Sequence, residues 1–250
     1  MKQKRYLFII ILILFAACAP KKECCVQPEQ LEVTLNFTHN WDLLELTKQD
    51  FNELKFTNAN GEQLSIEKLR YLVSNISLLD NKNHHLIDVG ENTGTSISIP
   101  DLTEGSYALS FRFGFSDEDN TDGVYPDLNS VSFNVPEMLG GGYHFMQFDG
   151  KYLDTNTEES GFNYHTIRAV DRTDPGNLKF KDTSFEVNLG TIKITNTTEI
   201  EIEVNLAEWF KNPNTWNLNE LNTVLMPNFE AQKIMSANGK DVFSLGEVTP

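Results

Sequence analysis

Alternation of apolar and polar residues constrains the fold of this chain more than any other feature. In residues 33–39 the side chains of Val33, Leu35 and Phe37 alternate with polar ones, and His39 continues the apolar phase. The same period of two recurs in residues 107–115 and 199–206, and shorter runs favour strands in 69–79, 131–135 and 185–189. A period of two is typical of strands with one buried face. Because Asn-Gly, Asp-Gly and Pro separate the runs, the sequence predicts an all-β fold, an antiparallel β-sandwich or barrel-like domain.

Helical signals are few and lie mainly near the C-terminus. Residues 218–225 carry apolar side chains at helical spacing before Pro227, which predicts a helix of about two turns. A last short helix is expected around residues 231–235, ending at Asn238 and Gly239. Residues 43–51 favour a short helix and residues 207–211 a turn. The predicted fold is therefore β-rich with a few short helices.

The N-terminus resembles a bacterial lipoprotein signal peptide. Basic residues at positions 2, 4 and 5 precede an apolar run at 6–15, and two alanines stand directly before Cys18. The run is too short to cross a bilayer as a helix. We expect residues 1–17 to be a signal peptide, Cys18 to be lipidated, residues 18–30 to form a tether, and residues 31–250 to form one β domain. An ordinary secretory signal, which would leave the protein unanchored, is the alternative.

The residue after Cys18 and the overall charge indicate where the protein acts. Ala19 in place of Asp resembles the outer-membrane sorting pattern, so we expect an outer-membrane lipoprotein facing the periplasm or the cell surface. The formal net charge of −16 makes nucleic acid an unsuitable partner. Cys24 and Cys25 lie in the tether, so the β domain has no disulfide framework. No nucleophile elbow, Walker loop, dinucleotide fingerprint or metalloprotease motif occurs, and no enzyme activity is predicted.

Two neighbouring tracts between residues 138 and 168 hold His144, Met146 and His165 in a chain with five histidines. If both tracts are strands, His144 and Met146 share one face, and a hairpin pairing brings His165 within reach of them. Imidazole and thioether ligands suit copper, above all Cu(I). His39, from the first strand, is a candidate third histidine ligand. The alternative is that these side chains are ordinary core residues without a metal.

Several segments together resemble the MbnP-like family of exported copper-binding proteins. The most specific are residues 70–76 (RYLVSNI), Gly142-Tyr143 with Asp149-Gly150 following, and Tyr164-His165. The resemblance covers nearly the whole chain after the tether. It implies a β-rich fold, an extracytoplasmic location, copper binding by histidines, and a di-haem peroxidase-like partner. In some members a tryptophan oxidised to kynurenine assists the histidines.

The chain departs from that family at the position of the modified tryptophan. Gly140, Gly141 and Gly142 stand where such members carry Trp before the Gly-Tyr pair, so a kynurenine ligand is not carried over. A carboxylate-rich loop at residues 117–123 lacks the EF-hand register, which favours a solvated turn over a calcium site. Two functions therefore remain open. One is a copper-binding lipoprotein that sequesters or delivers the metal, and the other is a metal-free β-sandwich module for a glycan or an envelope protein.

Overall fold

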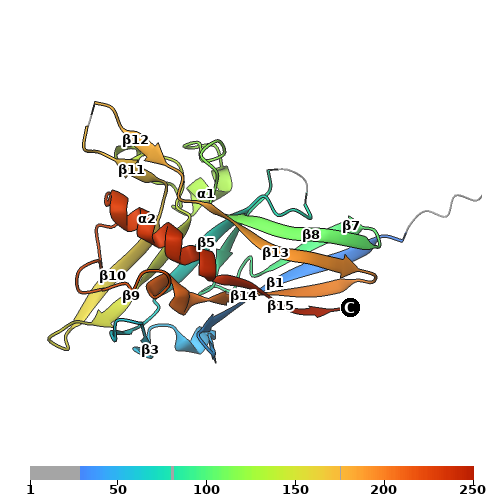
Figure 1. The fold of residues 1–250 in the computed structure, drawn as a ribbon, viewed down its shortest axis with the longest axis horizontal. Coiled ribbons are helices and arrows are strands. Elements are labelled where there is room, and N and C mark those ends of the chain that lie inside the picture. Colours follow the sequence, from blue (N-terminus) through green and yellow to red (C-terminus); the bar gives the residue numbers. More distant parts are fainter. Residues whose placement is uncertain (1–28, 80–81, 175) are drawn as a thin grey trace, which may run out of the picture.

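The computed structural model describes residues 29–79, 82–174 and 176–250, and within them the predicted all-β fold is confirmed. The predicted signal peptide, Cys18 and most of the tether lie outside the described residues. Two sheets pack face to face at one end of the molecule, and a long hairpin extends the second sheet toward the other end (Figure 1). No helix among the described residues is both long and apolar enough to cross a membrane.

The first sheet is built around the strand that opens the domain. Its order is β15-β14-β1-β2, and β7 also pairs with β1. Most pairings are antiparallel as predicted, but β1 and β14 run parallel with Val33 opposite Thr198. The strands are β1 (Leu31–Trp41), β2 (Leu44–Glu45), β7 (Ser96–Leu102), β14 (Thr198–Asn205) and β15 (Phe243–Thr249).

The second sheet carries the segments that the sequence analysis linked to metal binding. Its order is β13-β8-β5-β9-β4-β3, with β10 paired to β9 and β6 paired to β5. A small hairpin, β11 with β12, projects from the same end as β10 (Figure 1). The strands are β3 (Phe56–Thr57), β4 (Gln63–Leu64), β5 (Lys68–Ser74), β6 (His84–Asp88), β8 (Gly105–Phe113), β9 (Met146–Leu153), β10 (Glu159–Thr166), β11 (Ala169–Asp171), β12 (Lys179–Lys181) and β13 (Phe185–Ile194).

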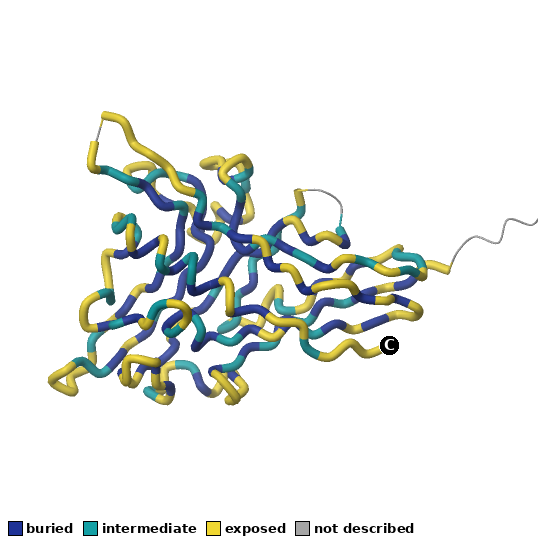
Figure 2. Tube along the Cα trace, in the orientation of Figure 1, coloured by how far each residue is buried: buried dark blue, intermediate teal, exposed yellow. Residues whose placement is uncertain are grey.

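One hydrophobic core lies between the two sheets and continues under the hairpin of β9 and β10. Buried and exposed positions alternate along the strands, as the period-two pattern predicts (Figure 2). Aromatic rings fill the space between the sheets. Phe37 of β1 meets Phe111 of β8 edge to face at 5.7 Å, and Tyr164 of β10 packs on Trp216 at 4.6 Å. These contacts hold the inner faces, so the polar side chains of β5, β9 and β10 are left on the outer face.

The helices are short. They are α1 (Pro126–Ser130), α2 (Phe229–Asn238) and the 3-10 turns η1 (Lys48–Asp50), η2 (Glu137–Leu139), η3 (Leu206–Phe210) and η4 (Gly239–Asp241). The predicted last helix corresponds to α2, which begins after Asn228, whose side chain caps the Ala231 N–H. The predicted helix at 218–225 is wrong. That segment forms turns, because the Asn217 side chain accepts the Asn219 N–H and Val224 adopts a positive φ of 57°.

Candidate metal centre

His144 and His165 meet on the outer face of the second sheet. Their ring centroids lie 5.2 Å apart at an interplanar angle of 84°. His165 stands on β10 directly opposite Gln147 of β9, so the two side chains share a face. His144 precedes β9 and is 4% exposed. The structure thus brings together the two histidines that the sequence analysis placed in neighbouring tracts.

Met146 does not lie with them, and the expectation that it shares a face with His144 is wrong. Met146 pairs with Thr166 and Tyr71, which places it on the inner face, opposite to His165. The alternation fails because Phe145 forms a bend before β9 begins. There the Phe145 N–H donates to the Thr166 carbonyl at 2.8 Å. His144, on the far side of the bend, is therefore out of phase with the strand.

His39 does not join the pair either. It projects from β1 into the core, where its Nε2 lies 2.9 Å from the hydroxyl of Tyr71. Tyr71 belongs to the inner face of the second sheet, whereas His165 belongs to the outer face. The sheet itself therefore separates His39 from the two other histidines. Burial lowers the pKa of His39 to about 4 and keeps its imidazole neutral.

Each of the paired imidazoles is held by one ring nitrogen. His144 Nδ1 donates to the carbonyl of Phe133 at 3.0 Å, because a carbonyl can only accept. His165 Nε2 lies 2.7 Å from the carboxylate of Asp149, two residues along β9 from Gln147. Neither Asp149 nor the Phe133 carbonyl was foreseen from the sequence. Asp149 carried a signal, since in antiparallel strands a carboxylate diagonal to a histidine lies within reach of it.

The other nitrogen of each ring has no partner. His144 Nε2 and His165 Nδ1 are both buried, and neither makes a hydrogen bond. In a neutral imidazole whose hydrogen-bonded nitrogen is protonated, the other nitrogen carries a lone pair. Burial lowers the pKa of His144 to about 4, although the Phe133 carbonyl opposes the shift, so the ring is neutral near pH 7. A neutral imidazole with a free lone pair is the form that binds a metal.

The surroundings of Asp149 fix the orientation of His165. Burial raises the pKa of Asp149, but hydrogen bonds from His165 and Asn163 outweigh it, so the net pKa is lowered. Asn163 Nδ2 donates to the same carboxylate oxygen at 2.7 Å, and Lys68 Nζ lies 3.9 Å from the other. A carboxylate behind a histidine is the usual outer support of a metal ligand. Asp149 is therefore an ionised acceptor that aims His165 Nδ1 away from itself.

A second polar row closes the site beside the histidines. Arg70 Nε donates to Gln147 Oε1 at 2.7 Å, and its Nη2 donates to the Val131 carbonyl at 2.9 Å. Gln147 Nε2 in turn donates to the Ser132 carbonyl at 3.3 Å. These bonds fasten the loop that supplies the Phe133 carbonyl to the outer face of the sheet. Side chains of β5 and β9 therefore hold the loop whose Phe133 carbonyl binds His144.

The glycine run at 140–142 leads to His144, and its backbone conformation favours glycine. Gly142 has φ +77°, and a Cβ there would lie 2.5 Å from Asn120 Oδ1. Gly140 has φ +114°, and a Cβ would lie 2.6 Å from Val170 Cγ2. Tight packing against Asn120 and Val170 leaves no room for a side chain at either position. The glycine run is therefore packed tightly against its neighbours where the chain approaches His144.

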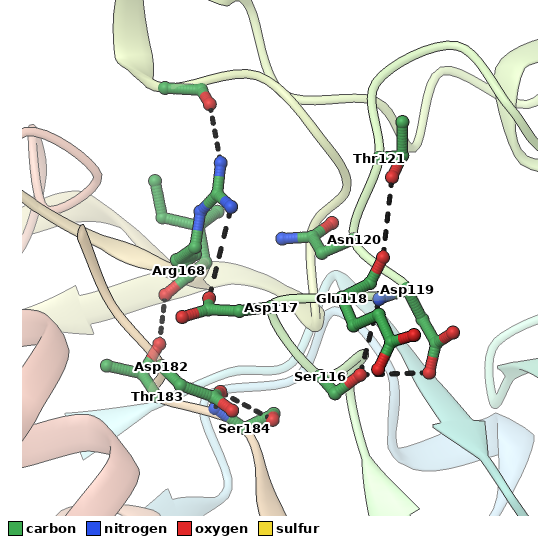
Figure 3. A network of polar contacts seen from close by, with 12 residues as sticks. Ser116, Asp117, Glu118, Asp119, Asn120, Thr121, Arg168, Asp182, Thr183 and Ser184 are labelled. Atoms are coloured by element: carbon green, nitrogen blue, oxygen red, sulfur yellow. Dashed lines mark hydrogen bonds and ion pairs between the residues drawn. The ribbon is translucent and has the colours of Figure 1, made fainter.

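Arg168, just after the end of β10, contacts both this glycine run and the acidic loop, and Figure 3 shows it beside Asp117. Its Nη2 donates to the Gly140 carbonyl at 3.0 Å, and its Nη1 lies 3.9 Å from Asp117. The guanidinium also stacks over the ring of Phe180 at 4.3 Å. In the acidic loop, Asp119 accepts from Ser116 at 2.9 Å. Among the described residues no three His, Cys, Asp or Glu side chains form a group that could hold a metal ion.

Among the described residues, the histidine pair offers two ring nitrogens that have no hydrogen-bond partner. Structural zinc requires four ligands in a tetrahedron, and magnesium or calcium requires oxygen ligands. Cu(I) is a closed-shell ion that accepts two or three ligands, and imidazole is a good copper ligand. The pair therefore fits Cu(I) better than these other ions.

Comparisons with known proteins agree with this architecture. The model of the MbnP family matches residues 30–227. A solved structure, MbnP from Methylosinus trichosporium, is similar with a TM-score of 0.50 and 13% sequence identity, over 75% of this chain and 80% of that chain. At this identity the likeness is one of fold. None of the curated proteins compared with the chain matches it. Because the family model spans most of the sequence, the chain belongs to the MbnP family.

Proposed function

We propose that this protein is an envelope-anchored lipoprotein that binds copper as Cu(I) through His144 and His165 and sequesters or delivers it. The observation that carries the proposal is the pair of buried, unpartnered ring nitrogens, one on each contacting imidazole. A buried lone pair without a donor is costly unless a bound group satisfies it, and a metal cation is such a group. Membership of the MbnP family also supports a copper-related function.

The surrounding residues supply binding and orientation rather than catalysis. The Phe133 carbonyl and the Asp149 carboxylate each hold one nitrogen of a ring, so both lone pairs are fixed before the metal arrives. Pre-formed ligands lower the entropic cost of binding. Nothing in this arrangement calls for a nucleophile or a general base, and we propose a non-enzymatic role. A lipid on Cys18 would keep the domain at the outer membrane.

The test is competition with a colourimetric Cu(I) chelator on the purified, reduced domain. His144→Ala and His165→Ala should each weaken binding at least tenfold, about 1.4 kcal/mol. His85→Ala is the matched control, because His85 also has a buried ring nitrogen without a partner but makes no ring contact with another histidine in the described chain. It should leave the affinity unchanged. Equal affinity in the wild type and the His144/His165 double variant would favour the metal-free binding module instead.

A further inference from the structure

We propose that Gln232 of helix α2 is a positioning residue for the copper site, which it serves by holding the backbone of His165. This inference rests on the proposed copper-binding function. Gln232 lies outside the part of the chain that the family model matches, which ends at residue 227. Its side chain is 1% exposed and faces β10. Two of its three side-chain hydrogen bonds go to backbone groups at or just after the end of that strand, and the third goes to the preceding loop.

The Gln232 amide replaces a neighbouring strand along the open edge of β10. Its Nε2 donates to the His165 carbonyl at 2.8 Å, and its Oε1 accepts the Ile167 N–H at 2.8 Å. A carbonyl at one residue and an N–H two residues later are the groups that the N–H and C=O of one residue in a parallel partner strand would bind. Nε2 also donates to the Leu225 carbonyl at 3.1 Å, so the bridge is anchored to the preceding loop as well.

This edge has little other support near His165. In the described chain β10 pairs with β9 along one edge. Along its other edge, the backbone hydrogen bonds go to Gln232 of α2 and to the loop before α2. Asn222 gives the equivalent support farther from the site, where its carbonyl accepts the Asn163 N–H at 2.8 Å. Strand ends without a partner fray most easily. Gln232 therefore fixes the strand where the His165 side chain begins, while Asp149 fixes the ring.

Loss of that hold should alter the imidazole more than it alters the fold. Small displacements of a ligand backbone are magnified at the ring, and outer-sphere supports of metal ligands typically contribute about tenfold or more to affinity. A merely structural role for Gln232 predicts a different result, namely lower stability with an unchanged site. The positioning role and the merely structural role can be distinguished by changing a second buried amide of α2 in the same way.

Asn238 provides this matched control. It is 0% exposed, belongs to the same helix, and its Nδ2 donates to the Trp209 and Asn214 carbonyls while its Oδ1 accepts the Asn214 N–H. Like Gln232, Asn238 binds backbone carbonyls through its amide nitrogen and a backbone N–H through its amide oxygen. Its partners, however, belong to η3 and the following loop. Gln232→Glu and Asn238→Asp each exchange one buried amide donor for a carboxylate oxygen facing two carbonyls. Thermal unfolding, Cu(I) competition and the imidazole ¹⁵N chemical shifts of the metal-free protein are then measured for both.

We expect Gln232→Glu to weaken Cu(I) binding about tenfold and to shift the His165 ring resonances. Asn238→Asp should lower the melting temperature while the affinity and the His165 shifts stay at wild-type values. Equal losses in the two variants, or an affinity within about twofold of wild type for Gln232→Glu, would overturn the proposal. If Gln232→Glu does not fold, Gln232→Met and Asn238→Leu are judged by the same criteria. Wild-type protein that binds no Cu(I) would refute the proposed function alone, because the ¹⁵N shifts still test the hold on His165.

Discussion

The imidazoles of His144 and His165 contact each other edge to face at 5.2 Å, and each is fastened by a different kind of acceptor. A loop carbonyl holds His144, and a carboxylate on the adjacent strand holds His165. The carbonyl is uncharged and the carboxylate is ionised. The two ligands therefore differ in the charge of their supports, and variants that affect them separately should have separable effects on copper binding.

Removing the carboxylate behind His165 should weaken copper binding without abolishing it. In Asp149→Ala the ring loses the bond that fixes its tautomer and orientation, so we expect Cu(I) affinity to fall about 10–100-fold. Chelator competition measures the change. Asn163→Ala removes a neighbour of the same carboxylate without touching either ring and should change the affinity far less. Wild-type affinity in Asp149→Ala would show that His165 needs no carboxylate support.

Stability of the metal-free protein should fall as the pH drops from about 6.5 toward 4. Burial lowers the pKa of His39 from 6.5 to about 4. In this pH range His39 therefore binds a proton in the unfolded chain but stays unprotonated in the folded protein. The stability that this group contributes is present above pH 6.5 and is lost on acidification, with a limit on the order of 3 kcal/mol. His144 has its pKa lowered in the same direction and adds to the slope.

Urea unfolding at pH 7 and pH 5 measures this dependence. His39→Gln keeps a polar partner for the Tyr71 hydroxyl but cannot take up a proton, so its stability should vary less with pH than that of the wild type. The slope that remains belongs to His144 and to other titrating groups. Parallel curves for the two proteins would mean that His39 does not titrate differently on folding.

A side chain at Gly142 should destabilise the protein more than one at a glycine in open space. Gly142→Ala combines a positive φ with a Cβ 2.5 Å from Asn120 Oδ1, and we expect a loss of about 3 kcal/mol. Gly61 has φ +91° with nothing within 4 Å of a Cβ, so Gly61→Ala should cost about 1 kcal/mol from the backbone alone. Urea unfolding of the two variants gives the difference. Equal losses would show that Asn120 moves aside freely.

Membrane attachment should depend on Cys18. Cys18→Ser removes the thiol that would carry the lipid, so the protein should move from the membrane fraction to the soluble periplasmic or secreted fraction. Fractionation in high salt followed by immunoblotting makes the measurement. The Cys24→Ser/Cys25→Ser variant is the control and should stay with the membranes. Retention of Cys18→Ser in the membrane fraction would remove the lipoprotein assignment.

The local sequence was sufficient to predict several of the long strands and their inner faces, but the strand expected at residues 131–135 is wrong, because that segment forms only an isolated bridge. Alternation in β1 and β8 needs no long-range information, because each buried side chain follows from its own strand's period. The same reasoning located α2, which begins after Asn228, a residue type that commonly caps helices. It failed at residues 218–225, where apolar spacing competed with asparagine side chains that bind the backbone.

The composition of the candidate site depended on tertiary structure. The sequence supplied the histidines, but the period of two assigned Met146 to the side of His144, because no local signal marked the bend at Phe145. Which histidines meet was decided by strand pairing: β10 beside β9 brings His165 to His144, whereas β1 belongs to the other sheet and so holds His39 on the inner side. Faces follow from the period of a strand, whereas neighbours follow from which strands pair and in what register, and pairing is set by the whole core.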